Sequence, residues 1–315
     1  MTVKAWLLTE GAAGMISQAQ GLAESLGLTF EKHSIETKPP WRYLPAKLTP
    51  PYLWALQNTE STRLPPAPII ISCGRKSVAP ALILKKYHPQ TIAIHIQNPH
   101  VNHQLFDWII TPEHDGISGP NIIPTTGAIH GLTSSVIASH INALQEKTSK
   151  TKQIIAILLG GPARHHQFDL AASQSLMDQI TAKFDHTQYQ RWWIPSRRTP
   201  DATIDLLRKN LKQDDYLGSS QNREDYLSAL AHASYIIATE DSVSMISEAS
   251  ATGKPIYLAS LPKTRHARRI SSFHLKMKAM GITKTLDQPI EAWDYEPLHE
   301  GQRAAKILRD HGVIV

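Results

Sequence analysis

The sequence contains one cysteine, Cys73, among its 315 residues. It can therefore form no internal disulfide and no cluster of thiolate metal ligands, which fits a reducing compartment. It also has no low-complexity tract, no apolar run near the roughly 20 residues that a membrane-spanning helix needs, and no secretory signal in its first residues, MTVKAWLLTEG. These absences argue against secreted disulfide scaffolds and membrane-spanning proteins. They predict a cytoplasmic protein, for which peripheral association with the inner membrane stays open.

What remains is the composition of a globular protein, with 41% apolar and 19% charged residues. Lysine and arginine outnumber the acids by 33 to 27, and the net charge of +6 favours acidic partners such as nucleotides, phosphorylated sugars or anionic lipid headgroups. The sequence has no zinc-finger spacing, aromatic RNA-binding motif or recognition-helix pattern, which argues against nucleic acid. The stretches RHHQFD and PEHD form no closed ligand set, so we expect no metal.

Strand-like and helix-like segments alternate along the whole chain. This alternation predicts parallel sheets with helices on both faces, and a length prior of about 150 residues per domain predicts two domains. We expect an α/β protein of two Rossmann-like domains facing a central cleft, residues 1–148 and 149–295, joined by the charged linker LQEKTSKTK. A helix in 296–315 is expected to cross back to the first domain. The expected strands span 3–8, 69–72, 91–96, 108–111, 122–125, 153–159, 190–195, 235–238 and 255–259, and the expected helices span 17–26, 78–86, 134–145, 169–184, 200–211, 223–233 and 243–252.

One segment, residues 37–68, departs from this alternation because it holds eight prolines and two tryptophans. Proline cannot donate to a sheet or continue a helix, so we expect ordered loops and short helices there. An acceptor or membrane-surface platform is the alternative, since aromatic and basic residues favour the bilayer interface. The basic segment 263–278 is expected to be a solvated helix, and attraction to anionic lipid is its alternative role.

Six motifs occur in order: EGAAGMISQAQGLAESLG, SCGRKSVAPALIL, IHIQNPH, FDWIITPEHDGISGPNIIPTTGAIH, SRRTP and TEDSVSMISEASATGKPIYL. Together they resemble the bacterial branch of the mitochondrial-fission "elongated mitochondria" family. That family is similar to glycosyltransferases of the GT-B architecture, which implies an acceptor on the first domain and a nucleotide sugar on the second. The nucleotide sugar would be a co-substrate, with no cofactor or metal. Plant members are described as adaptors at the mitochondrial surface, which implies a non-catalytic alternative.

The last motif carries the candidate nucleotide wall. Its E-A and G-x-P letters resemble those of nucleotide-sugar transferases, in which the Glu248 position accepts bonds from ribose hydroxyls; a solvated helix residue is the alternative. The helix start at Ser242 and Ser244 offers backbone amides and hydroxyls to a diphosphate. Asp241 or Ser242 is also expected to cap this helix, and Gly253 to end it in the left-handed conformation.

Two further turns of the second domain are expected at the same edge of its sheet. Arg197 and Arg198 follow a strand, and guanidinium groups bind phosphate oxygens in bidentate fashion. Ser196 and Thr199 add hydroxyls, although Thr199 could instead cap a surface helix. Gly160 and Gly161 follow another strand and permit close approach of the backbone to a ligand.

The first domain offers a weaker set of candidates. Gly11 and Gly14 let the EGAAG loop face the expected cleft, but the resemblance places a catalytic histidine where this sequence has Met15. A thioether cannot act as a general base near neutral pH. Arg75 follows a strand and is predicted either to bind an acidic acceptor or to serve as a surface residue.

A replacement base is predicted in TPEHDG, where His114 stands between Glu113 and Asp115 just after a strand; a plain polar turn gives the same letters. The leading prediction is a nucleotide-sugar-dependent glycosyltransferase acting on an unknown acceptor, envelope or lipid-linked. A nucleotide-sugar epimerase and a non-catalytic adaptor with the same fold are the alternatives.

Overall fold

The computed structural model describes residues 4–57, 67–264 and 268–313. The chain divides into two compact units. Unit 1 comprises Met1–Gly131 and His299–Val315, and unit 2 comprises Leu132–Leu298. Each unit is a Rossmann-like layer structure around one parallel sheet.

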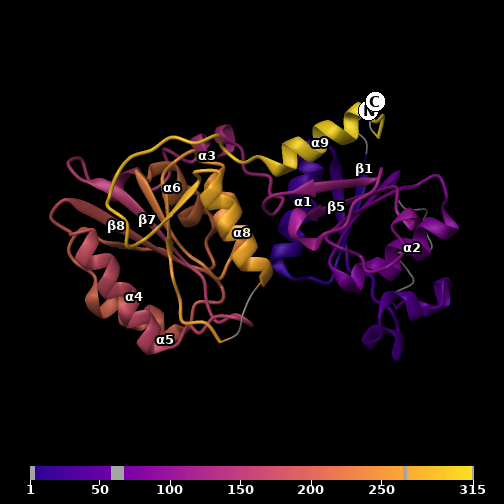
Figure 1. The fold of residues 1–315 in the computed structure, drawn as a ribbon, viewed down its shortest axis with the longest axis horizontal. Coiled ribbons are helices and arrows are strands. Elements are labelled where there is room, and N and C mark those ends of the chain that lie inside the picture. The colour runs from indigo at the N-terminus through magenta and orange to yellow at the C-terminus, as the bar shows by residue number, and fades with distance from the viewer. Residues whose placement is uncertain (1–3, 58–66, 265–267, 314–315) are drawn as a thin grey trace. The chain divides into compact units, whose positions relative to one another are not determined.

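Unit 1 holds a six-stranded parallel sheet in the order β2-β1-β3-β4-β5-β6. One face is covered by α1 and α9, which lie side by side in Figure 1, and Leu7, Ile71 and Leu308 meet there. On the other face Trp6 and Ile70 pack with residues of α2. The elements are β1 (Lys4–Thr9), α1 (Ala13–Leu26), β2 (Thr29–His33), β3 (Ile69–Cys73), α2 (Val78–Tyr87), β4 (Ile92–Ile96), β5 (Trp108–Pro112), β6 (Ile122–Thr125) and α9 (Glu300–Asp310).

Unit 2 holds a second six-stranded parallel sheet, in the order β12-β11-β10-β7-β8-β9. The side chains of β7 alternate between its two faces. Ala156 and Leu158 join a core with α3, α6, α7 and α8, whereas Ile157 joins a core with α4 and α5. The elements are α3 (Ser134–Ser139), β7 (Gln153–Leu159), α4 (Leu170–Lys183), β8 (Tyr189–Pro195), α5 (Asp201–Asn210), β9 (Tyr216–Leu217), α6 (Arg223–His232), β10 (Tyr235–Thr239), α7 (Val243–Ser250), β11 (Ile256–Ala259), α8 (Arg268–Ala279) and β12 (Thr283–Thr285).

The expected alternation of strands and helices is confirmed, but three short strands were not predicted: β2, β9 and β12. All three lie at or next to a sheet edge. In β2 no residue is fully buried, so the strand lacks the apolar alternation that marks a half-buried strand. Val3, the first residue of one predicted strand, lies outside the described residues, as do residues 265–267 of the predicted basic segment.

The boundary between the units lies earlier than the sequence predicted. Residues 132–148 were expected in the first domain, but Leu132 and Ile137 pack in a core of unit 2. The predicted helix over 134–145 is also too long, because α3 ends at Ser139 and turns follow. The expected linker is fixed to unit 2: Gln190 Nε2 donates to the carbonyl of Lys147 at 2.7 Å, and Ser149 N donates to Gln190 Oε1 at 2.7 Å.

The C-terminal helix α9 belongs to unit 1. Ala304 and Leu308 are fully buried in the same core as Leu22 of α1. The Glu300 carboxylate, 2% exposed, accepts a hydrogen bond from Thr126 N at 2.8 Å and pairs with Arg303 at 2.7 Å. The C-terminal helix therefore packs on the sheet of unit 1, although it follows unit 2 in the sequence.

The proline-rich segment forms short 3-10 turns at Trp41–Tyr43, Ala46–Leu48 and Leu53–Ala55, as predicted. Trp54 packs edge-on against Trp41 and stacks with Tyr52, with ring centroids 5.1 and 6.2 Å apart. Residues 58–66 of the predicted segment lie outside the described residues.

A buried ion pair in unit 2 gives a test of the fold. Arg191 of β8 donates from Nε and Nη2 to both oxygens of Asp215 at 2.9 and 2.7 Å, and both side chains are 2% exposed. We predict that Asp215→Ala lowers the free energy of unfolding in urea by about 3–5 kcal/mol, because it leaves a buried guanidinium unpaired. Asp205→Ala breaks an exposed pair with Arg208 and should cost under about 1 kcal/mol. Equal losses in the two variants would contradict this account.

Candidate functional site

Each sheet has one point at which its connections change direction. In unit 2 the chain runs from β7 outward to β8 and β9, then returns to β10 on the other side and continues to β11 and β12. Ligands of open parallel sheets bind outside the carboxyl ends of the strands at such a switch point. Three loops follow the carboxyl ends of neighbouring strands here: Gly160–Gly161 after β7, Ser196–Thr199 after β8, and Glu240–Ser242 after β10.

The Asp241 carboxylate joins these loops. Its side chain is fully buried, and it accepts hydrogen bonds from Arg198 Nη2 at 2.7 Å, Gly161 N at 3.2 Å and Thr239 Oγ1 at 2.6 Å. Thr239 Oγ1 in turn accepts from Gly160 N at 2.8 Å. Asp241 was predicted to contact a ligand or cap α7, but its oxygens are engaged inside the protein, so it acts on the site through the loops that it holds.

The two glycines after β7 are required by these contacts. A Cβ atom at Gly160 would lie 2.1 Å from Asp241 Oδ1, and one at Gly161 would lie 2.0 Å from the carbonyl oxygen of Arg198. Both distances are far shorter than van der Waals contact. The glycines were predicted to let a ligand approach; the structure shows that they let the other two loops approach.

The loop after β8 separates the roles of its two arginines. Arg198 Nη1 donates to the carbonyls of Gly161 and Pro162 at 3.2 and 3.4 Å, in addition to the bond from Nη2 to Asp241. Most of its donors are therefore used within unit 2. Arg197 is exposed and makes no ion pair among the described residues. Of the two guanidinium groups, that of Arg197 is the one available to a phosphate.

The hydroxyls of this loop are internal contacts too. Thr199 Oγ1 donates to the carbonyls of Gly160 and Leu159, at 2.6 and 3.1 Å, and accepts from Ser196 N at 2.9 Å. Thr199 does not cap α5, whose N-cap is Pro200. The alternative prediction of a Thr199 cap is therefore wrong, because a neighbouring strand end takes its hydroxyl.

Helix α7 begins as predicted. Ser242 is its N-cap and accepts from Met245 N at 3.4 Å, while Gly253 adopts the left-handed conformation with φ 70°. Ser244 is half-buried in the first turn. Glu248 is half-buried one turn further along the helix. It lies beside Tyr226, whose pKa is raised well above its ordinary value by the burial of the phenol and, second, by the Glu248 carboxylate. Glu248 thus lies in the second turn of α7, beside Tyr226 of α6.

Lys254 of the G-x-P motif has a structural role. Its Nζ donates to the carbonyls of Leu230 and Ala231, at 2.8 and 2.6 Å, at the end of α6. Burial lowers the pKa of Lys254 to about 8. Lys254 therefore links the residues that follow α7 to the C-terminal end of α6.

A buried polar group beside Asp241 was not predicted from the sequence. Glu240, 6% exposed, accepts from Leu261 N at 2.9 Å and lies 3.7 Å from both His166 Nε2 and Lys263 Nζ. Burial lowers the pKa of His166, and it lowers that of His274 to about 4, which favours neutral imidazoles. Glu240 lies in the TED stretch and His166 in the RHH stretch of the sequence. These stretches are far apart along the chain, and the strand order of the sheet brings them together.

The switch point of unit 1 lies between β1 and β3. Glu10, after β1, pairs with Lys76, after β3, at 3.0 Å. Met15 packs over Gly74, because a Cβ atom there would lie 2.3 Å from the Met15 sulfur. The Met15 thioether therefore packs on the loop after β3, and it cannot act as an acid or base at the position where the resemblance implied a histidine.

Gly11 and Arg75 lie after strands as predicted, whereas Gly14, predicted in the loop, lies in the first turn of α1, which begins earlier than expected. Gly11 has φ 87°, which favours glycine, while Gly14 lies within α1. Arg75 is exposed directly after the carboxyl end of β3. Cys73 is fully buried, and burial raises the pKa of its thiol, so it serves packing as expected.

The predicted base candidates follow the carboxyl end of β5. Glu113, His114 and Asp115 form a short 3-10 turn that ends at Gly116 in the left-handed conformation. Thr111 Oγ1 donates to Asp115 Oδ2 at 2.9 Å, which fixes the turn on the strand. His114 is half-buried and Glu113 is exposed. The turn places both side chains at the carboxyl edge of the unit 1 sheet.

Neither metal-ligand geometry nor a spanning helix is found in the part of the chain that the structure describes. No group of three or more His, Cys, Asp or Glu side chains there is arranged to hold a metal ion. No described helix combines the length and apolarity that crossing a membrane requires.

Two parallel six-stranded sheets in two units define a protein of the GT-B-like class. UDP-GlcNAc 2-epimerase of Methanocaldococcus jannaschii has a similar structure, with a TM-score of 0.57 and 12% identity over 98% of this chain and 99% of that one. The epimerase of Neisseria meningitidis bound to UDP-GlcNAc gives 0.53 and 12% over 98% and 92%. MurG of Acinetobacter baumannii gives 0.52 and 12% over 90% and 85%.

Within this class the chain belongs to the Mitochondrial fission ELM1 family, whose model matches residues 13–311. It is similar to the uncharacterized protein RP120 of Rickettsia prowazekii, with 26% identity over 353 aligned positions that cover 96% of this chain and 97% of the relative. It is also similar to the mitochondrial fission protein ELM1 of Arabidopsis thaliana, with 23% identity over 76% of this chain and 63% of the plant protein. The predicted family and fold class are confirmed.

The contact between Gly160 and Asp241 gives a test of the site's construction. We predict that Gly160→Ala lowers the free energy of unfolding of unit 2 by about 1–3 kcal/mol, because the added methyl group overpacks a fully buried carboxylate. Gly119→Ala is the matched control, since its Cβ would meet other atoms only at 3.5 Å or more. Urea denaturation measures both variants, and a Gly160→Ala protein as stable as the control would contradict the described loop contacts.

Proposed function

We propose that the protein binds a nucleotide sugar at the switch point of unit 2 and acts as a glycosyltransferase toward an acceptor of unknown identity. The observation that carries the proposal is the Asp241 carboxylate, which fixes three loops at the carboxyl ends of β7, β8 and β10. A site whose loops are held before the ligand arrives loses little freedom on binding. Structures of the same fold solved with UDP-GlcNAc support the ligand class.

Several groups near this switch point suit the parts of such a ligand. The Arg197 guanidinium is exposed and can pair with phosphate oxygens in bidentate fashion. The start of α7 adds the backbone amides of its first turn and the Ser244 hydroxyl, and a helix N-terminus favours negative charge. The Glu248 carboxylate is the proposed acceptor of hydrogen bonds from the ribose hydroxyls. The ligand would therefore lie along α7 from its first turn to Glu248.

Transfer from a nucleotide sugar forms a bond between the acceptor oxygen and the anomeric carbon and breaks the bond between that carbon and the diphosphate oxygen. As that bond breaks, negative charge grows on the diphosphate, and Arg197 with the α7 amides would stabilise it. A general base must take the proton of the acceptor hydroxyl. We assign that role to the imidazole of His114, in the turn after β5 where Glu113 and Asp115 flank it. Arg75 is the proposed contact for an acidic acceptor.

Binding is tested with a panel of nucleotide sugars in a thermal-shift assay, followed by calorimetry on each hit. At a ligand concentration of 100 Kd, binding should stabilise the protein by about 2.7 kcal/mol. Glu248→Ala and Arg197→Gln should each weaken binding about 10- to 100-fold, since each removes hydrogen bonds that involve a charged group. Arg208→Gln is the control, because Arg208 is an exposed arginine of α5 in the same unit.

No shift with any nucleotide sugar would contradict the proposal, and so would equal affinities in Glu248→Ala and in the control. Once a donor is found, the products distinguish the reaction classes. Release of nucleoside diphosphate together with a glycosylated acceptor supports transfer. An epimerised nucleotide sugar without release indicates an epimerase, and binding with neither product indicates an adaptor that kept the fold.

A further inference from the structure

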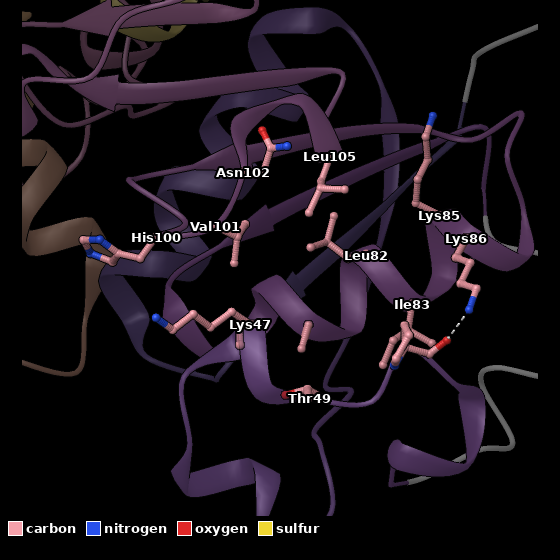
Figure 2. A pocket seen from close by; sticks show the side chains of 13 residues that line it. Lys47, Thr49, Leu82, Ile83, Lys85, Lys86, His100, Val101, Asn102 and Leu105 are labelled. Carbon is pink, nitrogen blue, oxygen red and sulfur yellow. Dashed lines mark hydrogen bonds between the residues drawn. The ribbon is translucent and has the colours of Figure 1, made fainter.

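Unit 1 contains a pocket that the proposed function does not use. Its volume is about 750 Å³, within the range of small-molecule sites. Three segments build it: the proline-rich segment, α2, and the loop between β4 and β5 (Figure 2). The lining residues are Ala46, Lys47, Thr49, Pro51, Ala79, Leu82, Ile83, Lys85, Lys86, His100, Val101, Asn102 and Leu105.

The walls are apolar and the edges are basic. Figure 2 shows Leu82, Val101 and Leu105 in the middle of the pocket. Toward one side of that view lie Lys47 and His100, and toward the other lie the remaining two lysines. The lining includes three lysines and no aspartate or glutamate. A pocket of this kind suits a ligand with an apolar body and a negative end.

Lys47 is the lysine best placed to receive that negative end. Lys85 is neutralised by Asp107 at 2.8 Å. Lys86 donates to the carbonyl of Pro51 at 3.1 Å and lies over the ring of Tyr52 at 4.5 Å. Lys47 is exposed and makes no ion pair with any residue that the structure describes.

Exposed apolar side chains continue from the pocket onto the surface of the proline-rich segment. Leu105, which lines the pocket, is 50% exposed, and Leu48, next to Lys47, is 55% exposed. Trp54 and Tyr52 are 53% and 46% exposed. Of the twelve exposed large hydrophobic residues among those described, five lie in residues 43–54. Such clustering marks a binding surface.

We propose that this pocket binds one anionic lipid molecule, with an aliphatic chain against Leu82, Val101 and Leu105 and the phosphate of its headgroup on Lys47. The chain would replace water on apolar walls, which is favourable in proportion to the area covered. The charge of the edge selects an anionic headgroup over a neutral or cationic one. This site uses no residue of the nucleotide site in unit 2 and does not rest on the proposed function.

The test uses dodecyl phosphate below its micelle concentration as the probe, with the full chain in a calorimeter. We expect the wild type to bind it and Ala46→Trp to abolish binding, because the indole fills the pocket. Lys47→Gln should raise the dissociation constant about fivefold, the worth of one lysine near an anionic lipid surface. Lys32→Gln, on the exposed edge strand β2, is the matched control and should leave it unchanged.

Each remaining arm either supports or overturns the proposal. Dodecyltrimethylammonium and inorganic phosphate should bind at least tenfold more weakly than dodecyl phosphate, and vesicles with phosphatidylglycerol should retain the wild type but not Ala46→Trp. Equal binding of the cationic probe, or unchanged binding by a folded Ala46→Trp protein, overturns it. Absence of dodecyl phosphate binding also overturns the proposal. Binding of an acidic amphipathic peptide in place of dodecyl phosphate would not rescue it. Nucleotide-sugar thermal shifts should be the same in all these variants, which keeps the two proposals separate.

Discussion

The buried Asp241 carboxylate is the interaction on which the candidate site depends. It lies at the switch point of the unit 2 sheet and accepts from the backbone of the β7 loop, from Arg198 of the β8 loop and from Thr239 of its own strand. A buried carboxylate is tolerated only when it is paired and hydrogen-bonded, so the loops and the acid stabilise one another. The glycines at 160 and 161 follow from the same constraint, since any side chain there would push the loops apart.

The two units differ in strand order and in the groups at their switch points. In unit 2 the side chains of Arg198, Thr199 and Asp241 bond to the loops around the switch point, and Arg197, Ser244 and Glu248 are the proposed ligand contacts. In unit 1 the corresponding place holds the Glu10–Lys76 pair and the Met15 thioether over Gly74. The proposed phosphate contacts therefore belong to unit 2, whereas the proposed acid–base groups belong to the turn after β5 in unit 1. This asymmetry fits a nucleotide-binding unit and an acceptor-binding unit.

The sequence predicted the parts of the fold that depend on local pattern. The strands β6 and β7, the start of α7 and the left-handed Gly253 follow from apolar runs, a capping serine and a helix-ending glycine. The roles of Arg198 and Thr199 could not be predicted, because their partners lie about 40 residues away along the chain. Those partners become neighbours only through the strand order. For the same reason the Glu240–His166 contact was missed, and Leu132 was assigned to the wrong unit.

Hydrogen–deuterium exchange in the presence of a bound nucleotide sugar tests the central claim most directly. We predict slower amide exchange at residues 160–161, 196–199 and 242–248 of unit 2, with little change at the pocket beside α2 in unit 1. The reduction should be weaker in Asp241→Asn, because the loops are then less firmly held. Protection confined to unit 1, or protection in unit 2 that leaves the start of α7 unchanged, would contradict the claim.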